Sequence, residues 1–313
     1  MEAPTLNKDE VEYFLTDILQ IHNWNEQLGN NRVEFLNHLM IKYQQIIPFQ
    51  TITLMSEDVE SRTVPKWSEI KTDIFAKTGG MCHTMNTFMW ALLKGLGYDV
   101  YLVLSSVVSI EQYLKKNLDH TIVIVRDLTI KGSLHVVDCG LGLAMREAII
   151  IKNPTKDQDS LNETIYQGSN EIFKYVRTEG GTYVRYHKKP KKWESTNDWR
   201  LSYWFDIQPT DFAEFYYDHA LRIYLGTPME EIHHFHYIVF LTRLDGERRI
   251  KIKNYEIMVE NEEHIMETSD IPQDELSDHI IRYFPGFKGK EDIMKKAFEN
   301  MEKIKERLSI KKS

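Results

Sequence analysis

A cysteine that follows two glycines is the residue of this chain best suited to covalent chemistry. Cys82 is one of only two cysteines among 313 residues, and it comes just after Gly79 and Gly80, where a helix is predicted to begin. A thiol at a helix N-terminus feels the positive end of the helix dipole, which lowers its pKa and favours the nucleophilic thiolate. The glycines permit a tight turn whose free N–H groups can face an oxyanion. Cys82 is therefore a candidate nucleophile, and the alternative is a small buried core residue.

A cysteine nucleophile needs a base and a group that orients the base. His120 stands before the β-branched run 121–125, and Asp138 ends the apolar run 134–138. The polar residues 127–133 favour a hairpin, in which the start of the first strand lies beside the end of the second. We therefore predict that His120 and Asp138 meet at one end of a sheet. The order Cys, His, Asp suits acyl transfer.

Other histidines compete for the role of the base. His83 adjoins Cys82, but neighbouring helix residues point about 100° apart, which makes contact between them difficult. His135 lies three positions before Asp138, so a period of two places it on the opposite side of the strand. The alternative roles are structural: His120 would cap a strand, and Asp138 would only end one. The spacing favours His120 and Asp138 over these alternatives.

Hydrophobic periodicity indicates the elements that must position these residues. Residues 1 to about 98 are predicted to be mostly helical. From Tyr98 to Trp204, short β-rich runs favour a small barrel or a strongly curved sheet. Residues from about 209 onward combine a three-stranded meander with a terminal amphipathic helix. The segments that carry these predictions are the helices 9–19, 33–47 and 82–96, the strands 172–176, 183–186, 238–242, 249–252 and 255–259, and the apolar helix positions Ile293, Ala297, Met301, Ile304 and Leu308.

Composition limits the classes of function. The net charge of -8 argues against nucleic-acid binding, and no apolar stretch is long enough to cross a bilayer. The N-terminus lacks the pattern of a secretory signal, and a disulfide between Cys82 and Cys139 would remove the nucleophile, so we expect a reducing, cytoplasmic compartment. No Cys/His cluster has zinc-ligand spacing, so no metal is expected. The histidine-rich segment 233–236 is predicted to lie on the surface of a strand, and the basic run 187–192 in a solvated loop.

The segments around Cys82, His120 and Asp138 resemble those of the arylamine N-acetyltransferases. That family carries Arg-Gly-Gly-x-Cys-x-(Glu/Gln)-x-Asn on a helix, a histidine before a hydrophobic strand, and a later Val-Asp-x-Gly-Phe-Gly segment. The resemblance extends from about residue 10 to about residue 290 and is most specific around the three candidate residues. The matching segments are 47–51, 78–86, 119–120, 137–142, 224–228 and 245–248.

Four positions depart from the family pattern. Thr78 stands where the family has the arginine before the double glycine, and Gln50 stands where it has the acidic residue after Pro-Phe. Thr84 occupies the position two after the cysteine, where the family has Glu or Gln. In the family that arginine and that acidic residue pair; here both are neutral, so no unpaired buried charge is left behind. The aromatic residue of the Gly-Phe-Gly loop is Leu141, which implies weaker stacking on an aromatic acceptor.

The resemblance implies an α+β fold with a cysteine-protease-like Cys82–His120–Asp138 triad. Its domains would be a helical bundle carrying the nucleophile (1–98), a central β-barrel carrying the histidine and aspartate (99–208), and an α/β lid with the terminal helix (209–313). The implied activity is ping-pong transfer of an acetyl group from acetyl-CoA through Cys82 to an arylamine, arylhydrazine or arylhydroxylamine, as in xenobiotic metabolism. Tyr224 and Thr227 are candidates for contact with CoA, and Asp119 and Leu141 for contact with the acceptor.

Two other classes of function remain open at this point. A thiol hydrolase or a transglutaminase-like enzyme would use the same three residues on a different acyl donor. A non-catalytic descendant that binds a ligand is the other alternative, and the neutral residues Gln50, Thr78 and Thr84 favour it. The expected partners are an aromatic amine and an acyl-CoA, without nucleic acid or membrane, and the pattern says nothing about oligomeric state.

Overall fold

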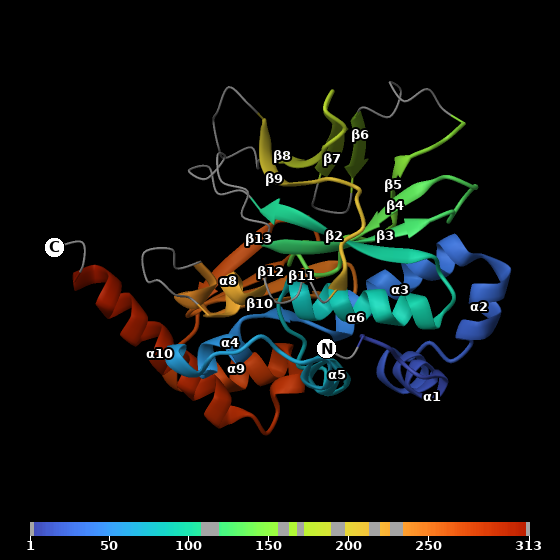
Figure 1. Ribbon diagram of the computed structural model, residues 1–313. Coiled ribbons are helices and arrows are strands. Elements are labelled where there is room, and N and C mark those ends of the chain that lie inside the picture. The colour runs from blue at the N-terminus through green and yellow to red at the C-terminus, as the bar shows by residue number, and fades with distance from the viewer. Residues whose placement is uncertain are drawn as a thin grey trace.

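The computed structural model describes residues 3–107, 119–155, 163–167, 172–188, 198–212, 220–225 and 234–310. Most of the helices precede the first long strand, and two more close the chain (Figure 1). The α-helices are α1 (Lys8–Tyr13), α2 (Trp24–Asn30), α3 (Arg32–Ile46), α4 (Ile52–Ser56), α5 (Trp67–Phe75), α6 (Cys82–Gly95), α8 (Ala220–Leu225), α9 (Leu276–Tyr283) and α10 (Glu291–Ile310). The predicted helix 9–19 continues from α1 as a π-helical turn, Phe14–Ile18.

The helix that carries Cys82 has a well-defined end. Gly97 adopts a positive φ of 76°, which glycine tolerates without strain. Its N–H donates to the carbonyl of Lys94 at 3.0 Å, and the N–H of Tyr98 donates to the carbonyl of Leu93 at 3.0 Å. This pair of bonds is a Schellman motif. It confirms the predicted end of the helix and turns the chain into the next strand.

An antiparallel sheet of eight strands packs against α6, which contacts β2 and β3 (Figure 1). Its strand order is β5-β4-β3-β2-β9-β8-β7-β6. The apolar residues of this sheet share one core with those of the N-terminal helices. The strands are β2 (Val100–Val107), β3 (His120–Arg126), β4 (Leu134–Val137), β5 (Ile149–Lys152), β6 (Glu163–Gln167), β7 (Ile172–Arg177), β8 (Tyr183–Lys188) and β9 (Trp199–Phe205).

This sheet curls into a nearly closed barrel, as one contact demonstrates. Three strands separate β4 from β8 in the sheet, so a flat sheet would place these two strands roughly 19 Å apart. Nevertheless Nη1 of Arg185, on β8, lies 3.7 Å from Oδ2 of Asp138, the residue that follows β4. Only strong curvature brings the two side chains together, which confirms the predicted barrel.

A second antiparallel sheet has the order β1-β10-β11-β12-β13 and packs against α9 and α10 through its own core. The predicted three-stranded meander is confirmed, although its first strand begins two residues later than predicted. The sheet also contains β1, an edge strand from the N-terminal region. Because that edge strand pairs with β10, the region predicted to be the first domain is joined to the third, and the division into three domains stays a prediction. The strands are β1 (Phe49–Gln50), β10 (Phe240–Asp245), β11 (Arg248–Lys253), β12 (Glu256–Glu260) and β13 (Met266–Asp270).

The terminal helix α10 is docked on α4. Asn300 donates to the carbonyl of Met55 at 3.0 Å, and Ala297 and Met301 are buried in the second core. The prediction that Ile293 belongs to the buried face is wrong, because its side chain is 40% exposed and Met294 is buried instead. The buried face of the helix therefore begins at Met294.

The prediction that the histidine-rich segment lies on the surface of a strand is also wrong. His234–His236 form a 3₁₀ turn and no strand, and His236 is buried, with Nδ1 2.5 Å from Nη1 of Arg62. In the basic run, His187 and Lys188 end β8, and residues 189–192 lie outside the described residues. No helix within the described ranges combines the length and apolar character needed to cross a bilayer.

Candidate active site

The loop before Cys82 is held against a neighbouring backbone segment. The backbone N–H of Gly80 donates to the carbonyl of Pro48 at 3.2 Å, and the backbone N–H of Gln50 donates to the carbonyl of Gly80 at 3.1 Å. Gly79 has a φ of 75°, and a Cβ atom there would lie 1.9 Å from the carbonyl oxygen of Pro48. No larger residue fits this position. The close approach places Cys82 at the first position of α6, as predicted, with only 4% of the residue exposed.

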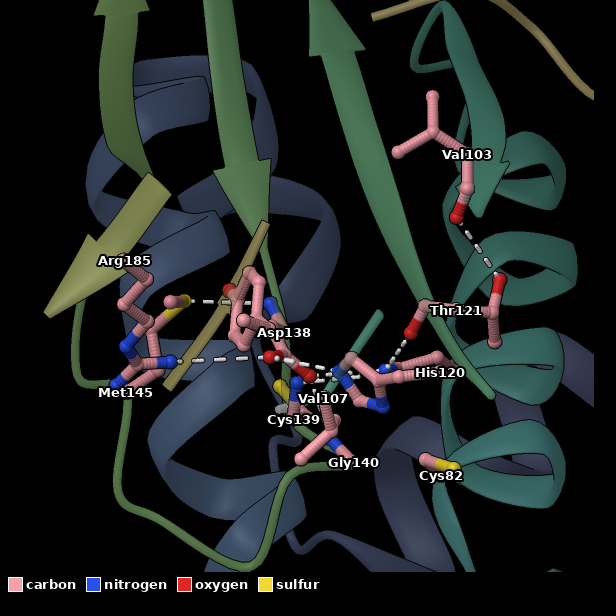
Figure 2. Close-up of polar contacts among 12 residues, drawn as sticks. Cys82, Val103, Val107, His120, Thr121, Asp138, Cys139, Gly140, Met145 and Arg185 are labelled. Carbon is pink, nitrogen blue, oxygen red and sulfur yellow. Dashed lines mark hydrogen bonds and ion pairs between the residues drawn. The ribbon is translucent and has the colours of Figure 1, made fainter. Parts of the chain in front are cut away.

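The predicted hairpin brings His120 and Asp138 together. Strands β3 and β4 pair antiparallel with Val123 opposite Val137, so the first residue of β3 lies near the segment that follows β4. Nε2 of His120 lies 3.1 Å from Oδ2 of Asp138, and both residues are buried. Figure 2 shows Asp138 between the His120 ring and the Arg185 guanidinium, with Cys82 beyond the ring. The expected meeting of His120 and Asp138 is thus present in the structure.

Asn86 joins the cysteine helix to this pair, and the prediction gave it no role. Its amide donates to Oδ1 of Asp138 at 2.9 Å and to the carbonyl of Thr121 at 2.6 Å. Its side-chain oxygen accepts from the N–H of Cys139 at 3.1 Å. Asn86 follows Cys82 by four positions, which places both on one face of α6. That spacing was the available signal for its role.

Arg185 is the second residue that the sequence did not reveal. It lies in a β-rich run, and no local pattern connects it with Asp138, from which it is separated by 47 positions (185 − 138). The guanidinium is fully buried and lies within ion-pair distance of the carboxylate, with Nη1 3.7 Å from Oδ2. Only the curvature of the barrel makes this contact.

The charges of these groups support an ionised site. Burial raises the pKa of Cys82, but the imidazoles of His83 and His120, which also form hydrogen bonds to the thiol, lower it to about 6. Burial lowers the pKa of His120, but the charge of Asp138 and its hydrogen bond raise it to about 10. Burial also opposes ionisation of Asp138, yet His120, Arg185 and Asn86 hold its pKa below the ordinary value. A thiolate and an imidazolium therefore coexist between about pH 6 and about pH 10.

The expectation that His83 can hardly reach Cys82 is wrong. Nδ1 of His83 lies 3.4 Å from Sγ of Cys82, which is within hydrogen-bonding distance for sulfur. His83 is therefore a second imidazole beside the thiol. His135, in contrast, pairs with Val125 inside the sheet, and burial lowers its pKa to about 4, so it is neutral.

The other candidate residues lie at different distances from the thiol. The carbonyl oxygen of Asp119 is 3.9 Å from Sγ of Cys82, and burial raises the pKa of the Asp119 carboxyl to about 7 despite the bond from the Val107 N–H. The hydroxyl of Tyr224 lies 3.3 Å from Oγ1 of Thr84. Leu141 is partly buried in the loop that follows Asp138. Thr227 lies outside the described residues.

The departures from the family pattern have partners of their own. Thr78 accepts a hydrogen bond from the ammonium group of Lys290, which comes from the segment just before α10. The side-chain amide of Gln50 donates to Oγ1 of Thr53 at 2.6 Å, and its oxygen accepts from the backbone N–H of Thr53 at 3.0 Å. The two positions are thus supported separately. The segment that carries Cys82 is anchored to the C-terminal part of the chain through Thr78.

Alkylation of Cys82 is expected to follow the lowered pKa of its thiol. The rate with iodoacetamide should increase as the pH rises through about 6 and then level off, because the thiolate is the reactive form. Cys139 should react far more slowly, since burial raises the pKa of its thiol well above the ordinary value. Peptide mass spectrometry after short exposures distinguishes the two cysteines. A Cys82 profile that rises only near about pH 8.5, the value of an ordinary cysteine, would contradict the ionised site.

Comparison with known proteins identifies a family for this chain. A family model described as N-acetyltransferase matches residues 32–285. Probable arylamine N-acetyltransferase 1 of Dictyostelium discoideum is 24% identical over 179 residues, which are 55% of this chain and 53% of that protein. The chain thus spans about half the length of this curated relative.

Solved structures share the fold. The arylamine N-acetyltransferase of Mycobacterium marinum superposes with a TM-score of 0.71 at 14% identity, covering 94% of this chain and 100% of that one. The structure of the Mycobacterium marinum enzyme in complex with CoA gives 0.65 at 15% identity, covering 87% of this chain and 93% of that one. Because the family model covers most of the sequence, the chain belongs to the arylamine N-acetyltransferase family of enzymes.

Proposed function

We propose that this protein transfers an acetyl group from acetyl-CoA to an aromatic amine, hydrazine or hydroxylamine through a thioester on Cys82. The observation that carries the proposal is the connected set of Cys82, His120 and Asp138, in which the thiol has a pKa of about 6. Family membership supports the acetyl group, and the relative solved with CoA supports an acyl-CoA donor. The two cysteines, both free and buried, support a reducing compartment such as the cytoplasm.

The first half-reaction forms the acetyl-enzyme. The Cys82 thiolate attacks the thioester carbonyl carbon, and the tetrahedral oxyanion collapses by breaking the bond to the CoA sulfur, which leaves with a proton from His120. The N-cap residue Met81 makes no side-chain bond to the start of α6, so backbone N–H groups there are suited to stabilise the oxyanion. Asp138 holds the tautomer and the orientation of His120.

The second half-reaction regenerates the thiolate. The amine nitrogen attacks the acetyl carbon, His120 takes a proton from that nitrogen, and the bond to sulfur breaks to release the amide. We assign Asp119 to the acceptor side because its carbonyl oxygen lies 3.9 Å from Sγ of Cys82. Leu141 is assigned there because it follows Gly140, where an added Cβ atom would lie 2.9 Å from Cα of Cys82. Tyr224 and Thr227 are assigned to CoA, and since Thr84 already holds the Tyr224 hydroxyl, the ring of Tyr224 would make the contact.

Brief exposure to acetyl-CoA tests the proposal directly. Intact-protein mass spectrometry should show a gain of one acetyl group, accompanied by a burst of free CoA equal to the enzyme present. An arylhydrazine added afterwards should discharge the adduct and yield its N-acetyl product. Cys82→Ala should remove the adduct, whereas Cys139→Ala, which deletes the other buried thiol, should keep it. An intact fold without burst or adduct would refute the proposal, and an adduct that only water discharges would identify a hydrolase.

A further inference from the structure

A buried arginine stands behind the aspartate of the site. The Arg185 side chain is fully buried, and Figure 2 shows its guanidinium on the side of Asp138 opposite to His120. Nη1 of Arg185 lies 3.7 Å from Oδ2 of Asp138. Among the described residues, none of its three nitrogen atoms makes a hydrogen bond of strict geometry, and the hydroxyls of Tyr175 and Tyr203 interact with it only at looser geometry. The arginine therefore interacts with Asp138 mainly through charge.

Aromatic rings form the rest of its surroundings. The guanidinium carbon lies 4.4 Å from the ring centre of Phe173, 5.5 Å from that of Tyr203 and 5.9 Å from that of Tyr175. Such rings attract a cation but do not neutralise it. A buried charge without a counter-ion is strongly unfavourable, so Arg185 depends on a nearby anion. Asp138 supplies that anion.

The two carboxylate oxygens of Asp138 contact different groups. Oδ1 accepts from Asn86 at 2.9 Å and from the N–H of Gly140 at 3.3 Å. Oδ2 faces the two cationic groups, His120 at 3.1 Å and Arg185 at 3.7 Å. The neutral donors thus fix the position of the carboxylate, and the cationic groups fix its charge.

The charges of Cys82, His120 and Asp138 cancel only when Arg185 is counted with them. With Cys82 as thiolate and His120 as imidazolium, Cys82, His120 and Asp138 together carry one negative charge. These residues are at most 4% exposed, so water screens that excess little. The Arg185 guanidinium makes the sum zero. Removal of this cation must therefore make the loss of the Cys82 proton less favourable.

We propose that Arg185 is a positioning residue that keeps Asp138 ionised and balances the one negative charge that Cys82, His120 and Asp138 carry together. The inference deepens the proposed function, since it rests on Cys82 acting as the nucleophile. Arg185 touches no reacting atom; it acts through Asp138 and His120.

Other titratable groups face the same site and must be held constant in a test. Asp119 has a pKa raised to about 7 by burial, so its titration overlaps with that of Cys82. Burial and the charges of Arg185 and Arg200 lower the pKa of His187, which keeps that ring neutral. Comparison of variants that differ only at residue 185 cancels these contributions. The surrounding groups are His83, Asp119 and Tyr224 beside Cys82, and Cys139, Tyr175, Tyr203 and His187 around Asp138 and Arg185.

The test compares the pH profile of Cys82 alkylation in three variants. Arg185→Met removes the charge and keeps much of the volume, whereas Arg185→Lys keeps the charge. Arg126→Met is the matched control, because Arg126 also lies over a tyrosine ring, 4.0 Å from the ring centre of Tyr101. It stands at the end of β3 opposite to His120, roughly 20 Å away along the strand.

Arg185→Met should shift the inflection for iodoacetamide upward by about one pH unit, which means about tenfold less thiolate on the acid side. In Arg185→Lys the inflection should lie within about half a pH unit of the wild-type value, and in Arg126→Met it should be unchanged. An unmoved inflection in folded Arg185→Met, or equal shifts in the methionine and lysine variants, would overturn the inference. Iodoacetamide needs no acetyl-CoA, so this result is independent of whether wild-type Cys82 accepts an acetyl group.

A second comparison applies where Arg185→Met does not fold. Adding Asp138→Asn removes the carboxylate that the arginine accompanied, so the double variant should recover the fold measured by circular dichroism. Failure of the double variant to recover would assign Arg185 to packing on Phe173 and overturn the proposed balance of charge.

Discussion

Replacing Asp138 by asparagine is expected to lower the rate of acetyl transfer about 10⁴-fold. The carboxylate holds the imidazolium of His120 at 3.1 Å and raises the pKa of His120 to about 10. An asparagine has similar size but no charge, so it neither stabilises the imidazolium nor enforces the tautomer that can take a proton. Single-turnover acetylation of Cys82, followed by mass spectrometry, measures the loss at the chemical step itself.

The same substitution also tests the contribution of Asp138 to stability. It leaves the buried Arg185 without its counter-ion, which should lower the free energy of unfolding by about 3–5 kcal/mol. Rates must therefore be compared at a temperature where circular dichroism shows both proteins folded. Asp99→Asn is the matched control, since Asp99 pairs with Arg126 on the surface, and exposed pairs contribute only about 0–1 kcal/mol. Turnover of folded Asp138→Asn within about tenfold of wild type would remove Asp138 from the mechanism.

His120→Gln and His83→Gln are expected to have unequal effects, because both rings contact the thiol and His120 is held by the Asp138 carboxylate at 3.1 Å. Loss of His120 removes the group that we propose moves the protons, so turnover should fall about 10²–10⁴-fold at every pH. Loss of His83 removes an imidazole that lowers the pKa of Cys82, so this pKa should rise while His120 remains in place. Turnover of His83→Gln should therefore be low near pH 6 and recover as the pH increases.

The pH–rate profiles of the two variants decide between the histidines. Recovery of His120→Gln at high pH, together with a loss in His83→Gln that no pH restores, would reverse the assignment. Wild type should gain activity as the pH rises through about 6, the pKa of Cys82, and lose it near about 10, where His120 gives up its proton.

Local patterns in the sequence were sufficient for the central part of the site. Cys82 at the first position of α6 follows from helical periodicity and from the glycines before it. The meeting of His120 and Asp138 follows from a hairpin, whose register depends on the short segment that joins its two strands. In both cases the residues that decide the geometry are close neighbours in the chain, so periodicity and turn chemistry carry the information.

Tertiary structure alone decided the remaining contacts. Arg185 reaches Asp138 because an eight-stranded sheet curls across three intervening strands, and curvature has no signature in a single strand. Lys290 reaches Thr78 because the C-terminal segment docks beside the loop before α6. The contact of His83 with Cys82 depends on a side-chain orientation that backbone periodicity does not specify. The sequence by itself thus determined the position of Cys82 and the meeting of His120 with Asp138, whereas long-range packing determined the charges that surround them.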